Sequence, residues 1–150
     1  MRRRAFLTTL AATGPGLGSG CLSSLDDSAL RLGYLDVANW DTEPHRLEVR
    51  VARDGAQVHT SSHELSGRDT DRIPSEVVDC TWDDIPGEYT VSGRADDGAW
   101  TEQPLRPSAV PDADADCLAV GVWYRSGSVG FQIASGCDSD YDGMCPFTSE

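Results

Sequence analysis

Leu47-Glu48-Val49-Arg50-Val51 is the stretch that decides the fold, because apolar and polar side chains alternate along it without a break. Strict alternation is typical of a β-strand with one buried face. Asp54-Gly55 follows, a dipeptide that favours a two-residue hairpin turn. Such a turn predicts a return strand over residues 57–65 and places Val51 opposite Val58 on one face.

Further strand patterns recur about every ten residues on both sides of this hairpin, each bounded by turn residues. No helix-length periodic segment follows the N-terminal leader. The expected strands lie within residues 30–40, 73–82, 89–95, 100–105, 118–124 and 129–133. For the last pair, a two-residue turn at Ser126-Gly127 places Val122 opposite Phe131 and Val120 opposite Ile133.

Pro86-Gly87-Glu88-Tyr89-Thr90-Val91 resembles the tyrosine corner of immunoglobulin-like sandwiches, in which a tyrosine hydroxyl pins a crossover between sheets. The match is incomplete, because no cysteine follows Tyr89 by two residues. With the strand spacing, it predicts an all-β, immunoglobulin-like antiparallel β-sandwich of about seven or eight strands after an N-terminal signal segment.

The N-terminus reads as an export signal. Arg3-Arg4-Ala5-Phe6-Leu7 matches the core of a twin-arginine (Tat) signal, with Arg3, Arg4, Phe6 and Leu7 as its defining residues. The apolar segment after it is too short and too interrupted by Gly14-Pro15-Gly16 to span a bilayer. Cys21 resembles the lipidated cysteine of a lipobox, although Leu17 stands four residues before it where three is usual. An ordinary cleavage site is the alternative to lipidation.

The composition is strongly acidic. The chain has 25 Asp+Glu against 12 Lys+Arg, and all of the basic residues are arginine. Removal of residues 1–20 leaves a formal charge of −16. At molar salt the Debye length falls to roughly 3 Å, which screens this self-repulsion. A lysine-free acidic surface is therefore expected of a halophilic protein, and it argues against binding nucleic acid or anionic headgroups.

Together the leader, Cys21, the lysine-free surface and the motif around Tyr89 resemble small Tat-exported lipoproteins of haloarchaea. The resemblance implies a single sandwich domain tethered to the outer face of the cytoplasmic membrane, with no catalytic residues to carry over. The expected organisation is a signal peptide at 1–20, a tether at 21–29, a β-sandwich at 30–137 and an acidic, disulfide-linked tail at 138–150.

Four cysteines remain for the exterior. An even number in an exported domain predicts two disulfides. In the two-residue hairpin register Cys117 and Cys137 point to opposite faces, which favours Cys80–Cys117 with Cys137–Cys145. Cys117–Cys137 with Cys80–Cys145 is the alternative. A zinc site is disfavoured, because the spacings contain no CxxC pair.

Asp138-Ser139-Asp140-Tyr141-Asp142-Gly143 has the DxDxDG spacing of a calcium loop. Its candidate ligands are Asp138, Asp140 and Asp142, but Ser149 stands at the twelfth position, where a bidentate glutamate belongs. The two readings are an acidic tail and a loop holding a structural calcium ion. No other cofactor is expected.

His59, Ser61 and His63 share one face of the return strand, and solvent-facing positions are expected for them. Two histidines four residues apart on a strand lie about 13 Å apart along its axis, too far for one metal ion. We expect a non-catalytic, membrane-anchored extracellular lipoprotein that acts as a binding or structural envelope module. Its partners would be the membrane, through the lipid, and an unknown cell-surface protein or envelope component.

The alternative is a small extracytoplasmic metal-dependent or hydrolytic enzyme. It requires at least two of His45, His59 and His63 to meet a carboxylate within about 4 Å, the reach of a hydrogen-bonded base.

Overall fold

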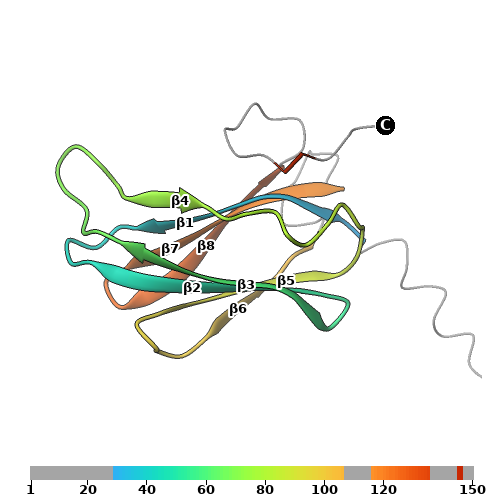
Figure 1. Cartoon of the computed structure of the whole chain (residues 1–150), viewed down its shortest axis with the longest axis horizontal. Helices are drawn as coiled ribbons and strands as arrows, with labels where there is room; N and C mark the ends of the chain where they lie inside the picture. Colours follow the sequence, from blue (N-terminus) through green and yellow to red (C-terminus); the bar gives the residue numbers. More distant parts are fainter. Residues whose placement is uncertain (1–28, 107–115, 136–144, 147–150) are drawn as a thin grey trace, which may run out of the picture.

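The computed structural model describes residues 29–106, 116–135 and 145–146, and in this part of the chain two four-stranded sheets pack face to face (Figure 1). The strand order is β4-β1-β7-β8 in one sheet and β3-β2-β5-β6 in the other. The described residues contain no helix. The strands are β1 Arg31–Asn39, β2 His45–Arg53, β3 Ala56–Leu65, β4 Ser75–Val77, β5 Tyr89–Ala95, β6 Thr101–Pro104, β7 Cys117–Arg125 and β8 Ser128–Ser135.

The predicted all-β sandwich is thereby confirmed, with one departure from antiparallel pairing. β1 runs parallel to β7, and the register slips by one residue between Leu32 and Tyr34. Every other pairing between named strands is antiparallel. Parallel neighbours cannot be joined by a tight turn. Most of the described chain accordingly lies between β1 and β7 in the sequence.

The hairpin between β7 and β8 follows the predicted register. Ser126 and Gly127 have φ angles of 52° and 84°, as a two-residue turn with left-handed central residues requires. Val122 pairs with Phe131 and Val120 with Ile133, as predicted. Their apolar side chains therefore face the opposite sheet.

The hairpin between β2 and β3 corrects the sequence prediction. Asp54 and Gly55 form the predicted turn, with φ angles of 52° and 82°. A register shift between Val51 and Ala52 then places Val51 opposite His59, one residue beyond the predicted partner Val58. An extra residue in one strand reverses which side chains face inward beyond it. From His59 onward, every second side chain of β3 therefore faces the core, beginning with His59 itself.

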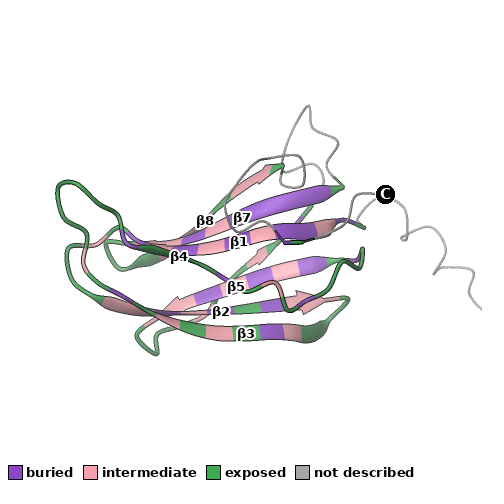
Figure 2. Ribbon diagram, turned by 45° about the horizontal axis from the view of Figure 1, so that its top comes forward, coloured by how far each residue is buried: buried purple, intermediate pink, exposed green. Residues whose placement is uncertain are grey.

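Buried side chains from both sheets form the core between the layers. In Figure 2 buried and less buried residues alternate along β2 and β5, as expected of strands with one face in the core. Trp82, in the segment between β4 and β5, is only 1% exposed. Its indole nitrogen donates to the carbonyl of Leu32 at 2.7 Å, so the buried N–H is satisfied.

Tyr89 opens β5 and closes the predicted tyrosine corner. Its ring is buried, and its hydroxyl donates to the carbonyl of Ile85 at 2.6 Å, four residues upstream. This bond fixes the crossover segment against the sheet that contains β5.

The disulfides correct the favoured pairing. Cys80 is bonded to Cys145, across 65 residues of sequence, so the predicted Cys80–Cys117 bridge is wrong. Cys117 is itself disulfide-bonded. The favoured pairing was inferred from the opposite strand faces expected for Cys117 and Cys137. Cys80, however, lies in the segment after β4, outside any strand. That placement depends on tertiary packing that strand parity does not report.

Candidate functional site

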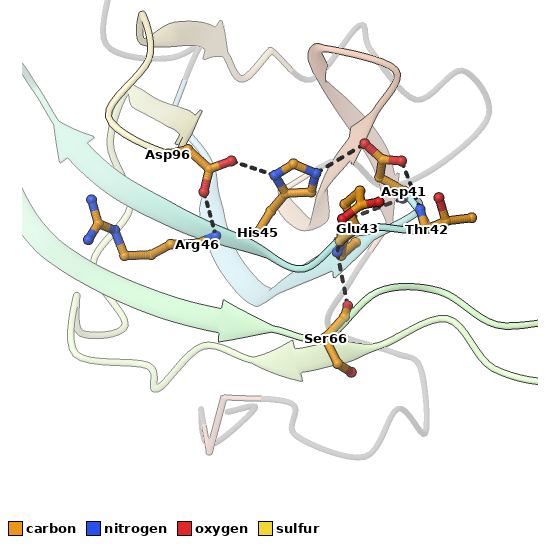
Figure 3. Close-up of polar contacts among 8 residues, drawn as sticks. Asp41, Thr42, Glu43, His45, Arg46, Ser66 and Asp96 are labelled. Atoms are coloured by element: carbon orange, nitrogen blue, oxygen red, sulfur yellow. Dashed lines mark hydrogen bonds and ion pairs between the residues drawn. The ribbon is translucent and has the colours of Figure 1, made fainter.

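His45 stands between two aspartates at one end of the sandwich, as Figure 3 shows. It is the first residue of β2. Its Nε2 lies 3.0 Å from Asp41 Oδ2, and its Nδ1 pairs with Asp96 Oδ2. The other oxygen of Asp96 accepts the backbone N–H of Arg46 at 3.0 Å. Both ring nitrogens of His45 are therefore occupied by carboxylates.

The pKa of His45 follows from these partners. Burial works to lower it, but the hydrogen bonds from Asp96 and Asp41, together with their charges, outweigh burial and raise the pKa. The pKa of Asp41 is lowered, chiefly by its bond to His45. That of Asp96 is lowered by the Arg46 backbone N–H first and by His45 second. The trio behaves as an ion pair, which suits it to hold structure rather than to act as a free base.

Asn39 ties the same end together beneath His45. The residue is 0% exposed, and its amide nitrogen donates to the carbonyls of Glu43 at 2.8 Å and Ser66 at 2.9 Å. Its amide oxygen accepts the N–H of Asp41 at 3.0 Å. This buried amide is satisfied on both sides and locks the β1–β2 turn onto the segment after β3.

A shallow hollow of about 320 Å³ opens beside His45. Its walls come from the start of β2, the end of β3 and the β5–β6 turn. The lining residues are Pro44, His45, Arg46, Glu64, Leu65, Ser66 and Asp96. The imidazole in this wall is already paired with carboxylates, so His45 is not free to act as a base in the hollow.

A second polar cluster runs along the inner face of β3. Ser61 Oγ lies 3.0 Å from His59 Nε2 and 2.8 Å from His63 Nε2. At the outer ends, His59 Nδ1 pairs with Thr81 Oγ1, and His63 Nδ1 lies 2.7 Å from Glu76 Oε2. These five residues, from Glu76 through His63, Ser61 and His59 to Thr81, are called the β3 polar chain below.

The protons of the β3 polar chain have one consistent arrangement with both histidines neutral. A carboxylate only accepts, so His63 Nδ1 carries the proton toward Glu76 and its Nε2 accepts from the Ser61 hydroxyl. Ser61 has no second hydrogen, so it accepts from His59 Nε2–H, and His59 Nδ1 accepts from Thr81. Every bond then runs in one direction, toward Glu76.

Burial distinguishes this cluster from solvated surface. His59 is only 8% exposed, and its ring meets Trp82 edge-on with centroids 5.4 Å apart. Burial lowers the pKa of His59, and the nearby His63 lowers it further. The expectation that His59 and His63 face solvent is therefore wrong for His59, and the side chain of His63 is only 12% exposed. The cause is the β-bulge after Val51, which turns this set of side chains inward.

The side chains of the two histidines also approach more closely than their spacing along the strand predicted. Strand rise separates their backbones, but both rings lean toward the residue between them. As a result, both Nε2 atoms lie within 3.0 Å of the same oxygen atom.

A third feature lies on the outer face of the sheet that contains β1, β7 and β8. Asp36 lies above Gly121, where a Cβ would come within 2.9 Å of Asp36 Oδ1. Burial raises the pKa of Asp36, and its hydrogen bond with Tyr34 opposes that shift. A hollow of about 210 Å³ opens here, lined by Tyr34, Asp36, Ala119, Val120, Gly121, Gln132 and Ala134.

The remaining predicted site residues are not covered by the structure. Cys21, Cys137, the Tat residues Arg3, Arg4, Phe6 and Leu7, and the calcium candidates Asp138, Asp140 and Asp142 lie outside the described residues. Within the described ranges, no group of three or more His, Cys, Asp or Glu is arranged to hold a metal ion. Nor do those ranges contain a helix with the length and apolar character needed to cross a membrane.

No protein-family model matches this sequence, and no curated protein matches it.

Proposed function

We propose that this protein is a membrane-anchored extracellular lipoprotein, exported by the Tat pathway, that acts as a non-catalytic binding or structural module on the outer face of the cytoplasmic membrane. The observation that carries the proposal is the Cys80–Cys145 disulfide. Disulfides persist in oxidising compartments outside the cytoplasm. The leader at 1–20 and the cysteine that follows it supply a route to that compartment and a point of attachment.

The described polar clusters support a non-catalytic role. His45 has carboxylates on both ring nitrogens, and Asn39 is saturated by backbone groups. Groups that are already satisfied by one another hold structure and are slow to exchange partners for a substrate.

The test is fractionation of the tagged full chain in a halophilic archaeal host grown in molar salt. The wild-type protein is expected in the membrane fraction, degraded by protease added to intact cells, and without free thiols. Cys21→Ser should appear in the medium, because the lipid attachment point is gone. Arg3→Lys with Arg4→Lys should remain in the cytoplasm, and Ser19→Ala serves as the matched control. Cytoplasmic wild-type protein that retains residues 1–20 and free thiols would contradict the proposal.

One specific observation favours a second candidate, a small extracytoplasmic hydrolytic enzyme. Two histidines meet carboxylates, His45 and His63, as that alternative requires. Ser61, His63 and Glu76 also stand in the order of nucleophile, base and orienting acid. A fluorophosphonate probe separates the two functions. Labelling that is lost in Ser61→Ala would establish the hydrolase, whereas a non-catalytic module leaves the wild-type protein unlabelled.

A further inference from the structure

The geometry points to a transition-metal site on β3, in which His59 and His63 bind one divalent ion of the copper–nickel–zinc class through their Nε2 atoms. The inference is independent of the proposed function, because a metal could serve either a binding module or an enzyme. The starting observation is convergence, since both Nε2 atoms lie within 3.0 Å of Ser61 Oγ.

The outer partners of the two rings are those that a metal-binding histidine needs. Such a histidine donates its second ring nitrogen to a carboxylate, carbonyl or similar group, which fixes the tautomer and makes the metal-binding nitrogen more basic. His63 Nδ1 has Glu76 in this position at 2.7 Å, and His59 Nδ1 has Thr81. Both rings are thus held from outside with Nε2 aimed at a common point.

The protonation states also suit a metal. In the arrangement with both histidines neutral, His63 of the β3 polar chain presents a lone pair at Nε2, because its proton then points to Glu76. His59 needs only a tautomer change, in which Nδ1–H donates to Thr81 and Nε2 becomes free.

Ser61 occupies the point where the ion would sit. A metal–imidazole bond is about 2.0–2.1 Å long, so both nitrogens must move inward from their present distances to Ser61 Oγ. Rotation of the Ser61 side chain opens the position, and its hydroxyl and water can supply oxygen ligands. Two imidazoles with oxygen ligands suit Cu²⁺ and Ni²⁺ best among divalent ions, whereas Ca²⁺ and Mg²⁺ require oxygen ligands alone.

His45 provides an internal control. It also lies on a strand beside acidic residues, but Asp41 and Asp96 occupy both of its nitrogens. A histidine in that state has no lone pair to offer a metal without breaking an ion pair. The structure therefore distinguishes a histidine pair that can bind an ion from a histidine that cannot.

The experiment is calorimetric titration of the full chain with CuSO₄, NiSO₄ and ZnSO₄ at neutral pH. Sodium sulfate supplies the salt, since chloride competes for these metals. All proteins carry Cys21→Ser to remove a thiol ligand, and no reductant is added, so that the disulfides stay intact. One Cu²⁺ per chain is expected, bound more tightly than Ni²⁺ or Zn²⁺.

Five variants make the result decisive. His59→Ala and His63→Ala should each abolish the stoichiometric binding. Glu76→Gln should weaken it about 10–100-fold, because the outer partner of His63 loses the negative charge that makes the metal-binding nitrogen more basic. The Glu76 side chain is 51% exposed, so this change leaves the fold intact even if the histidine variants unfold. His45→Ala and Glu64→Gln are matched controls that should bind normally.

Electron paramagnetic resonance of the copper complex gives an independent measure, since two nitrogen ligands are expected in the wild-type complex and this two-nitrogen signal should be lost in each single histidine variant. The inference is overturned if the wild-type protein shows no saturable binding, or if binding of unchanged affinity survives His59→Ala, His63→Ala and Glu76→Gln.

Discussion

His45 on β2 and His59 on the neighbouring β3 have pKa values shifted in opposite directions. For His45, burial is outweighed by Asp96 and Asp41, so its pKa lies above the ordinary 6.5. For His59, burial and His63 act together, so its pKa lies below 6.5. A difference in pKa between the folded and unfolded chain makes stability depend on pH. The two residues should therefore limit stability on opposite sides of neutrality.

His45→Gln is expected to abolish the decrease in the free energy of unfolding that His45 causes as the pH rises. The folded protein holds the His45 proton more tightly than the unfolded chain, so this contribution is complete below pH 6.5 and is lost as the pH rises through the folded pKa. Urea unfolding at fixed molar salt checks it, measured from about one pH unit below the reference pKa of His to about two and a half units above it. The variant should be less stable than wild type at the acidic end, with the difference narrowing toward the alkaline end. A difference independent of pH would contradict the assignment.

His59→Gln is expected to act on the acidic side. The unfolded chain takes up a proton near pH 6.5, whereas folded His59 resists protonation until a lower pH. Below 6.5 the unfolded state therefore binds more protons, and the wild-type protein loses stability as the pH falls toward the folded pKa. The glutamine variant should show a flatter profile over that interval. Proton NMR titration of the ring hydrogens gives a direct check, with His59 titrating below His45.

The fold could be predicted from the sequence because its information is local. Alternation in β2 and the dipeptides Asp54-Gly55 and Ser126-Gly127 specify strands and turns through backbone conformation. The tyrosine corner at Tyr89 is equally local, since the hydroxyl bonds to a carbonyl four residues upstream. Such features need no knowledge of the opposite sheet.

The β3 polar chain could not be predicted in the same way, because it depends on a bulge and on two distant segments. Thr81 and Glu76 reach His59 and His63 from the other sheet layer and its connection. One signal was present in the sequence. Val58 and Leu65 are seven residues apart, so they cannot share a face of a regular strand, and only Leu65 has the parity of the two histidines. The conflict indicates one of two outcomes. Either a β-bulge reverses the alternation within the strand, or the polar side chains of the two histidines face the core.

Cys80→Ala with Cys145→Ala should lower the free energy of unfolding by about 2–4 kcal/mol. The bridge closes a loop of 65 residues, and Cys145 also donates its N–H to the carbonyl of Gly33 in β1 at 2.9 Å. Without the bridge the unfolded chain gains conformational entropy, and Cys145 is no longer held against Gly33. Urea unfolding in molar salt measures the change, with Cys21→Ser as the control. A loss below about 0.5 kcal/mol would mean that the bridge adds little constraint.

Gly130→Ala should displace the Trp123 indole from the outer face of the β7–β8 hairpin. Gly130 pairs with Trp123 across the strands, and a Cβ at position 130 would come within 2.1 Å of the indole ring. Since the ring is rigid and cannot yield by that much, a cost of about 1–3 kcal/mol is expected, with a red-shifted, more quenchable Trp123 fluorescence. The same substitution in a Trp123→Ala background should be close to neutral, because the clash then has no partner. If Gly130→Ala costs the same in both backgrounds, the cost arises from the backbone at position 130 and not from stacking of the indole over the glycine.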